Sequence, residues 1–158
     1  MVKKMEIEDK IIEEEKLAII NYNGNVEDMD ILIAKLLSWA EANKVKVVGS
    51  PFAIYFTSPQ NTKPDEMVYD IGIPVSKDTE LSEEGEIKVV ELLEHRVISI
   101  IHKGSYETLS ESYKEMVEYS IKHNYDIIGS PKEIYINSPH EVQEEELLTE
   151  IQFPVIKM

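Results

Sequence analysis

The chain is 158 residues long and contains no cysteine and a single tryptophan. Without cysteine, disulfide bonds, thiolate nucleophiles and cysteine-based metal sites are excluded. No segment approaches the run of about 18 apolar residues that a transmembrane helix requires, so no membrane attachment is expected. Residues 1–5 lack the apolar core of a signal peptide, and a cytoplasmic location is the expectation that follows.

Positive charge is also scarce, because 16 Lys and Arg residues stand against 31 Asp and Glu, which gives a formal net charge of −15. Proteins that bind phosphate backbones need clustered Lys and Arg, so direct nucleic-acid binding is not expected. An acidic surface attracts cations, although most of these acids are expected simply to face water. The composition, 42% apolar and 30% charged, is that of a soluble globular protein, and residues 1–158 are expected to form a single domain.

The chain does contain an internal repeat with an offset of 80 residues. Residues 6–75 laid on residues 86–155 give 17 identical pairs without a gap, and Gly49-Ser50-Pro51 recurs as Gly129-Ser130-Pro131. Self-similarity at a fixed period reports architecture. Two copies are too few for a solenoid, so we expect one pseudo-twofold domain with a ligand site at the seam between its halves.

Each repeat reads as strand, strand, helix, strand, strand, with a polar linker over residues 76–85. The short connections within each repeat favour antiparallel pairing. We therefore predict an α+β fold, in which two helices cover one face of a largely antiparallel sheet of about eight strands. The predicted strands cover residues 5–12, 17–22, 52–57, 67–75, 86–94, 96–103, 133–137 and 147–156, and the predicted helices cover residues 26–43 and 106–123.

Both predicted helices carry apolar or small residues at spacings of three and four, which is the period of one helical face. The N-cap of the second helix has two candidates. Ser105 could cap it, or Thr108 could cap it with Glu111 as the partner of a capping box. The predicted buried positions are Met29, Ile33, Leu36 and Ala40 in the first helix and Leu109, Tyr113, Met116 and Ser120 in the second.

Two acids occupy equivalent positions in the last strand of each repeat, Asp70 and Glu150. Because alternate residues of a strand point to opposite sides, both acids are expected to point away from the face that carries Ile71 and Ile151. An acid at this position could serve as the counter-charge for a cationic ligand, or it could simply face solvent.

Eight tyrosines are a second candidate set. A tyrosine ring offers a flat apolar face and a hydroxyl group, which suit planar or cationic ligands, although each ring could equally be packing in the core. Two pairs are related by the repeat, Tyr55 with Tyr135 and Trp39 with Tyr119. Further candidates are Tyr22, Tyr69, Tyr106, Tyr113 and Phe153.

The four histidines, His95, His102, His123 and His140, do not stand at metal-ligand spacing, so no metal site is expected. The chain has no phosphate-binding loop, no dinucleotide fingerprint and no G-x-S-x-G motif. We therefore expect no cofactor, and we identify no nucleophilic triad.

Several short motifs of the second repeat together resemble a known family. The motifs are Lys103-Gly104-Ser105-Tyr106-Glu107, Gly129-Ser130-Pro131, Glu133-Ile134-Tyr135-Ile136-Asn137-Ser138-Pro139 and residues 146–155. The set is similar to the GyrI-like small-molecule-binding domain, which is also the effector-binding domain of AraC-type and MerR-type transcription regulators. The resemblance covers nearly the whole chain, and the internal duplication is a trait of the family.

This resemblance implies two β-α-β-β modules with a groove between their helices, which binds bulky hydrophobic molecules that are often cationic or aromatic. It places Glu150 at the position of a buried acid that faces the ligand. It also places Tyr135 at the tyrosine of an E-x-Y-x-x-x-P motif and Tyr106 at the tyrosine of a G-x-Y turn. Some stand-alone members resemble DNA gyrase inhibitors, and others hydrolyse cyclopropane-bearing toxins with a Glu and aromatic residues.

The first repeat departs from the family pattern, because Asn23-Gly24-Asn25-Val26 has no tyrosine after its glycine. Residues 1–5 leave no room for a helix-turn-helix, so a stand-alone member that does not bind an operator by itself is expected. Three functions stay open. The favoured one is binding of a hydrophobic or cationic small molecule, in multidrug or toxin sensing or sequestration, with Glu150 as the charge. The alternatives are a hydrolase with Glu150 as general base, and a module for a protein partner such as gyrase or a regulator.

Overall fold

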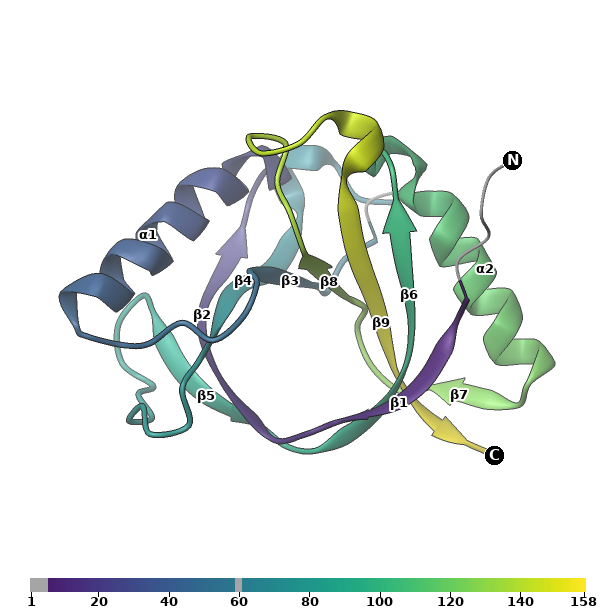
Figure 1. The fold of residues 1–158 in the computed structure, drawn as a ribbon, viewed down its shortest axis with the longest axis horizontal. Coiled ribbons are helices and arrows are strands. Elements are labelled where there is room, and N and C mark those ends of the chain that lie inside the picture. The colour runs from purple at the N-terminus through teal and green to yellow at the C-terminus, as the bar shows by residue number, and fades with distance from the viewer. Residues whose placement is uncertain (1–5, 59–60) are drawn as a thin grey trace. The chain divides into compact units, whose positions relative to one another are not determined.

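The structure is a computed structural model that describes residues 6–58 and 61–158. Met5 of the first predicted strand and Pro59 of a predicted loop lie outside the described residues. The chain divides into two compact units, and both are visible in Figure 1. Unit 1 comprises residues 1–12 and 95–158, and unit 2 comprises residues 13–94.

Unit 2 is an antiparallel sheet with one helix. Its strands, in spatial order, are β3 (Phe52–Tyr55), β4 (Val68–Val75), β2 (Glu15–Asn23) and β5 (Lys88–Leu92). A 3-10 turn over Val26–Asp28 leads into helix α1 (Met29–Ala42), and α1 packs against β4 and β2. The helix buries Leu32, Leu36 and Ala40, which join the β-branched residues of β2 and β4 in one apolar core.

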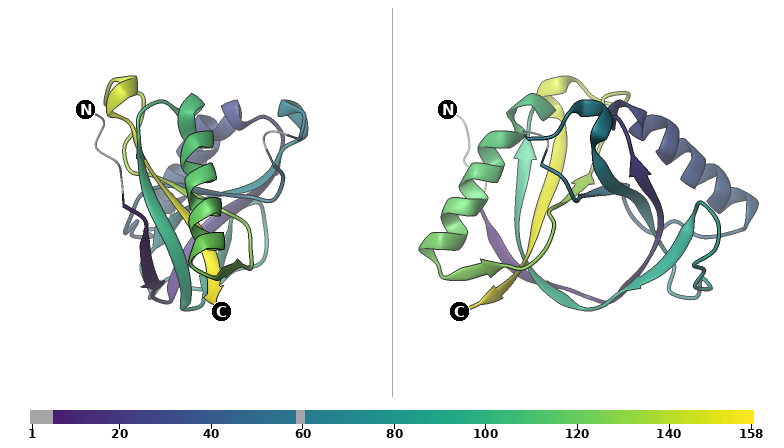
Figure 2. Two further views of the ribbon diagram at one scale, coloured as in Figure 1. Left: turned by 90° about the vertical axis from the view of Figure 1, so that its right-hand side faces the viewer. Right: turned by 180° about the vertical axis from the view of Figure 1, so that it is seen from behind.

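Unit 1 repeats this plan. Its strands, in spatial order, are β1 (Glu8–Ile12), β6 (His95–Lys103), β9 (Leu148–Lys157) and β8 (Lys132–Tyr135), and β7 (Tyr125–Ile127) pairs with the end of β9. A 3-10 turn over Tyr106–Thr108 leads into helix α2 (Leu109–Lys122), which lies across the strands in Figure 2. Met116 of α2 packs in a core with residues of β6 and β9, among them Ile100, Ile151 and Phe153.

The units do not coincide with the sequence repeats, because the first strands are exchanged. Strand β1 belongs to the first repeat but pairs with β6, and β5 belongs to the second repeat but pairs with β2. The two exchanges use the same register, since Ile12 lies opposite His95 and Leu92 lies opposite Glu15. Each unit is therefore built from segments of both repeats.

The predicted α+β class is confirmed, with two helices and nine antiparallel-paired strands among the described residues. The additional strand is β7, which is three residues long and follows Asn124 at a φ of 61°. Sequence analysis missed β7 because so short a segment shows no periodicity. The counterpart in the first repeat is a single bridge, Val47 with Val75.

Smaller differences concern the helices. The buried face of α1 includes Leu32 where Ile33 was predicted, and Ile33 is only partly buried. At the start of the second helix, Ser105 is the residue that caps, because its Oγ accepts the backbone N–H of Glu107. Thr108 makes no side-chain capping bond.

The strand exchange predicts where an engineered disulfide will form. Directly opposed residues of antiparallel strands have Cα atoms about 4.5–5.5 Å apart, which is within the range of a disulfide. The variant Ile12→Cys/His95→Cys should therefore oxidise within one chain and raise the free energy of unfolding by up to about 4 kcal/mol, since the bond closes a long loop.

Mass spectrometry of tryptic peptides without reduction, together with urea unfolding, measures both effects. The two single-cysteine variants are the controls. Failure of the double variant to form an intramolecular bond would contradict the pairing of β1 with β6.

Candidate functional site

The helix-covered face of unit 1 carries a polar group of residues at the ends of three neighbouring strands. The backbone register places His102 of β6 opposite Thr149 of β9, and Thr149 opposite Tyr135 of β8. Because residues two apart in a strand point to the same side, Glu133 of β8 shares this face with Tyr135. Glu133 lies opposite Ile151, which belongs to the core under α2.

Glu133 is the buried acid of this face, with 6% of its surface exposed. Its Oε2 accepts a hydrogen bond from the Tyr113 hydroxyl of α2 at 2.5 Å, and its Oε1 accepts one from the Tyr135 hydroxyl at 3.1 Å. Burial raises the pKa of Glu133, and the two phenol hydrogen bonds only partly oppose that rise. A carboxylate offers about four lone-pair positions, so about two remain for another donor.

Aromatic rings surround this carboxyl group. The ring of Tyr106 meets the ring of Tyr135 edge-on, with centroids 6.0 Å apart. The ring of Tyr113 lies against Phe153 at 5.7 Å. Tyr106 is partly exposed, whereas Tyr113 and Tyr135 are half-buried. The geometry combines one buried acid with several ring faces and edges, which is a combination that suits an organic cation.

His102 holds the turn that presents Tyr106. Its Nδ1 lies 2.7 Å from the Ser112 hydroxyl, and its Nε2 lies 3.1 Å from the Ser105 carbonyl oxygen and 2.9 Å from Thr108 Oγ1. A carbonyl oxygen only accepts, so Nε2 carries a hydrogen, and Nδ1 forms the hydrogen bond with the Ser112 hydroxyl. The buried imidazole thus ties β6 to the first turns of the second helix, where Tyr106 lies.

Glu150, the acid singled out from the sequence, lies on the opposite face of β9. Its Oε2 accepts hydrogen bonds from Lys10 Nζ, Ser99 Oγ and Gln152 Nε2, each at 2.8 Å. Burial pushes the pKa of Glu150 upward, but the hydrogen bonds from Lys10, Gln152 and Ser99 outweigh it and hold the pKa below its ordinary value. Glu150 is therefore already paired with a cation of the exchanged strand β1.

Asp70 occupies the corresponding position in unit 2 and is nearly as buried as Glu133. Its Oδ1 accepts a hydrogen bond from the Asn21 side chain, whose Oδ1 in turn lies 3.3 Å from Lys88 Nζ of the exchanged strand β5. Burial raises the pKa of Asp70, and the Asn21 hydrogen bond opposes this only in part. Asp70 and Glu150 thus take the predicted side of their strands, away from Ile71 and Ile151.

The candidate aromatic residues of unit 2 form a group of their own. The ring of Tyr69 lies between Tyr22, at 5.5 Å, and Tyr55, at 5.9 Å. The Tyr69 hydroxyl donates to the carbonyl oxygen of Asn25 at 3.0 Å, and burial raises its pKa above the ordinary value. Trp39 lies on α1 and is half-buried.

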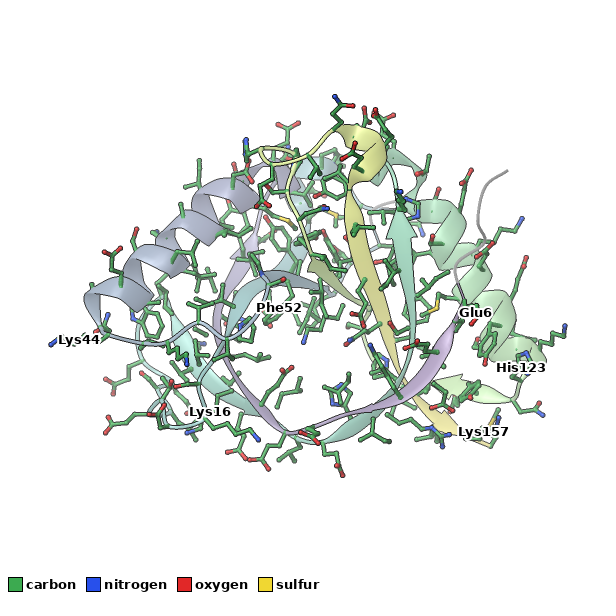
Figure 3. All side chains as sticks on the ribbon, in the orientation of Figure 1. Glu6, Lys16, Lys44, Phe52, His123 and Lys157 are labelled. Atoms are coloured by element: carbon green, nitrogen blue, oxygen red, sulfur yellow. The ribbon has the colours of Figure 1, made fainter. Side chains whose placement is uncertain are left out.

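Tyr119 lies at the far end of α2 from Tyr106, roughly 20 Å away at the helical rise. It contacts the ring of His123 at 4.3 Å and stacks on Tyr125 at 5.8 Å. Lys157 Nζ lies 4.5 Å from the centre of the Tyr125 ring, and Figure 3 labels His123 and Lys157 at this end of unit 1. The structure therefore brings Tyr106 and Tyr135 together and places Tyr119 elsewhere.

Sequence analysis missed Glu133 as a site residue, although it is the acid of the E-x-Y motif. The candidate acids predicted from the sequence are those present in both repeats, and the first repeat has Ala53 at the position equivalent to Glu133. The difference between the repeats was itself the available signal. An acid between Pro131 and Ile134, in a strand whose counterpart is apolar, marks a departure from the plan of the fold.

Two negative findings apply to residues 6–58 and 61–158. No three His, Asp or Glu side chains there are grouped so that they could hold a metal ion. Neither helix of this part of the chain has the length and apolar character needed to cross a bilayer.

Residues 5–156 match the family described as the GyrI-like small molecule binding domain, and the chain therefore belongs to the GyrI-like family. The C-terminal domain of EcmrR has a similar structure, with a TM-score of 0.83 at 23% identity, over 98% of this chain and 99% of that one. EcmrR in a DNA complex matches with a TM-score of 0.83 at 22% identity, and 98% of this chain spans 58% of that longer chain.

Two further structures show the same fold at lower identity. SAV2435 bound to tetraphenylphosphonium has a TM-score of 0.58 at 14% identity, over 96% of this chain and 94% of that one. A hydrolase encoded by lin2189 from Listeria innocua has a TM-score of 0.69 at 12% identity, over 95% of this chain and 91% of that one.

The raised pKa of Glu133 predicts how stability depends on pH. Above its ordinary pKa of 4.5, the unfolded chain loses the Glu133 proton before the folded protein does, so stability falls as pH rises towards the folded-state pKa. Glu133→Gln should remove this loss. The free energy of unfolding of the variant relative to wild type should therefore be higher at pH 8 than at pH 5.

Glu150→Gln is the control with the opposite sign. The pKa of Glu150 is lowered, so its ionised form stabilises the folded protein above pH 4.5, and that stabilisation is lost as pH falls through the lowered pKa. Urea unfolding at pH 5 and 8 measures the effect of Glu133, and urea unfolding at pH 3 and 5 measures that of Glu150. If the free energy of unfolding of Glu133→Gln relative to wild type is lower at pH 8 than at pH 5, the result contradicts the burial of an ionisable carboxyl group at this position.

Proposed function

We propose that this chain binds a hydrophobic organic cation in unit 1, with Glu133 as the counter-charge and Tyr106 and Tyr135 as aromatic contacts. The observation that carries the proposal is the state of Glu133. It is buried and its hydrogen bonds come from two neutral phenols, and no described Lys or Arg forms an ion pair with it. A buried carboxyl group without a cation either keeps a proton or favours a cation that enters.

The other two acids support this choice by contrast. Glu150 has Lys10 as its cation, and Asp70 is bonded to Asn21, which itself lies against Lys88. A ligand contact at Glu150 or Asp70 stays a prediction from the sequence. The same holds for Tyr55, Tyr69, Trp39 and Tyr119. Of these three acids, Glu133 is the one that has no lysine nearby among its described contacts, so a bound organic cation would supply its counter-charge.

The chemical class of the ligand follows from the surroundings of Glu133. Tyrosine rings attract a cation that lies over their faces, and this attraction grows as water is excluded. SAV2435, which shares the fold, is known in a structure with the lipophilic cation tetraphenylphosphonium. A role in sensing or sequestering cationic drugs or toxins, like an effector-binding domain, is the function proposed.

Binding can be tested by thermal shift with tetraphenylphosphonium and with neutral triphenylphosphine oxide of similar size. At about 100 times its dissociation constant a ligand adds about 2.7 kcal/mol of stability, which for a chain of this length raises Tm by about 5–10 °C. Wild type should respond to the cation more than to the neutral compound. Glu133→Gln should lose most of the cation response.

Glu150→Gln and Asp70→Asn are the matched controls, since each removes one charge from another strand position. Both should keep the response to tetraphenylphosphonium. If either control abolishes it while Glu133→Gln retains it, the counter-charge is the acid predicted from the sequence and the assignment to Glu133 is wrong.

A second candidate function is hydrolysis of a strained, electrophilic toxin. The specific observation in its favour is again the raised pKa of Glu133, because a carboxyl group with a pKa nearer neutrality is suited to general acid–base catalysis. The hydrolase encoded by lin2189 shares the fold. Glu150, the base predicted from the sequence, is held ionised by Lys10 instead.

Turnover separates catalysis from binding. A hydrolase should convert an aryl-substituted, activated cyclopropane to its ring-opened product in more than one equivalent per protein, and Glu133→Gln should abolish this. Liquid chromatography with mass detection measures the product. Product that stops at one equivalent, or forms equally with the variant, would exclude catalysis by Glu133.

A further inference from the structure

Thr149 carries the one unsatisfied hydroxyl group found among buried side chains of the described residues. Its side chain is 0% exposed, and its Oγ1 has no hydrogen-bond partner. A buried hydroxyl group without a partner has lost its hydrogen bonds to water and gained none in return, so it destabilises the folded protein. Such groups are rare in folded proteins, and each calls for an explanation.

Thr149 is a diagonal cross-strand neighbour of Glu133 on the same face of the sheet. Thr149 is directly opposite Tyr135 in the register of β9 and β8, and Glu133 is two residues before Tyr135 on the same face. Diagonal neighbours of this kind have Cα atoms about 7–8 Å apart, and their side chains can reach a common atom. One small polar group could therefore contact both the Thr149 hydroxyl and the Glu133 carboxylate.

The second copy of the fold shows that the unsatisfied hydroxyl is not a requirement of the architecture. In unit 2 the residue equivalent to Thr149 is Tyr69, whose hydroxyl is satisfied by the carbonyl oxygen of Asn25. The equivalent of Glu133 is Ala53, and the equivalent of Tyr113 is Ile33. Unit 1 thus contains all three features: the acid Glu133, the phenol of Tyr113 that bonds to it and the unsatisfied hydroxyl of Thr149. Unit 2 has other residues at all three positions.

We propose that the Thr149 hydroxyl is a ligand contact, and that the site selects ammonium ions that carry an N–H over quaternary cations. This inference rests on the proposed function. The N–H group can donate to Thr149 Oγ1 while Glu133 supplies the counter-charge, whereas a quaternary nitrogen has no hydrogen to donate. A quaternary cation obtains only the charge and the ring contacts.

For a ligand to contact Thr149, the side chain of Tyr135, which lies opposite Thr149 in the sheet, has to change its rotamer. Tyr135 is the half-buried neighbour, and its hydrogen bond to Glu133 is the longer of the two, 3.1 Å against 2.5 Å for Tyr113. Turning the ring frees Glu133 Oε1 to face the positive charge, and the Thr149 hydroxyl gains a charged donor, which forms the stronger kind of hydrogen bond. The edge-on contact with Tyr106 must also open.

The test uses two probes that differ in one methyl group, protonated N,N-dimethyl-1-naphthylmethylamine and its N-methylated quaternary salt. Calorimetric titration at pH 7 gives both dissociation constants. Wild type should bind the protonated amine at least about fivefold more tightly, the size expected for one net hydrogen bond. Thr149→Val, which keeps the shape and removes the hydroxyl, should erase this preference and leave quaternary binding within about twofold.

The same variant should be more stable than wild type without ligand, because it removes an unsatisfied buried group. Ser120→Ala is the matched control. Ser120 is also buried, but its hydroxyl donates to the Val117 carbonyl oxygen at 2.7 Å, so this variant should lower Tm and leave both affinities unchanged. Thr149→Ser retains the hydroxyl and should retain the preference for the N–H probe.

Each other outcome overturns the inference. If Thr149→Val weakens both probes equally, leaves the preference intact or lowers Tm, the hydroxyl has a structural role and is not a ligand contact. The proposed function survives that result, provided that the quaternary probe binds wild type and is lost in Glu133→Gln. If neither probe binds wild type, the proposed function and the inference both fail.

Discussion

The ion pair between Lys10 and Glu150 sets the electrostatics of unit 1. Strand β1 comes from the first repeat, and its pairing with β6 brings a lysine to the one strand acid that the two repeats have in common. In unit 2 the exchanged strand β5 brings Lys88 to Asn21, which bonds to Asp70. The exchange thus provides a cation near each repeated acid. Glu133, which has no counterpart in the first repeat, is left with phenols alone.

The fold was largely predictable because its signals are periodic and doubled. Helical spacing over residues 29–40 and 109–120, and β-favouring residues before each helix and after each Gly-Ser-Pro turn, predict most of the elements to within a few residues. The exchange of β1 and β5 was not predictable. Strands as short as β1 and β5, with five residues each, carry no pattern that specifies which repeat they pair with. The partner is chosen by tertiary contacts such as the bond of Tyr125 to Asp9.

The candidate site was predicted only in part, for a related reason. A repeat draws attention to positions that are alike in both copies, such as Asp70 and Glu150. The residues that distinguish unit 1, Glu133 and Thr149, differ between the copies. The two repeats share the scaffold, whereas the second carries Glu133 and Thr149 where the first has an apolar residue and a tyrosine whose hydroxyl is satisfied. The proposed binding residues thus lie where the repeats differ, and a comparison of the repeats within one sequence gives such positions little weight.

The exchange of β1 also affects the order in which the two units can fold during synthesis. The residues of unit 2 are contiguous, 13–94, so this unit has all of its strands once they have left the ribosome. Strand β1 emerges before them but pairs with β6, which begins at His95. Strand β1 therefore stays unpaired while some 90 further residues are synthesised, at about 5–20 residues per second. Its consecutive charged residues, Glu8, Asp9 and Lys10, are of the kind that keep an unpaired strand from pairing with another chain.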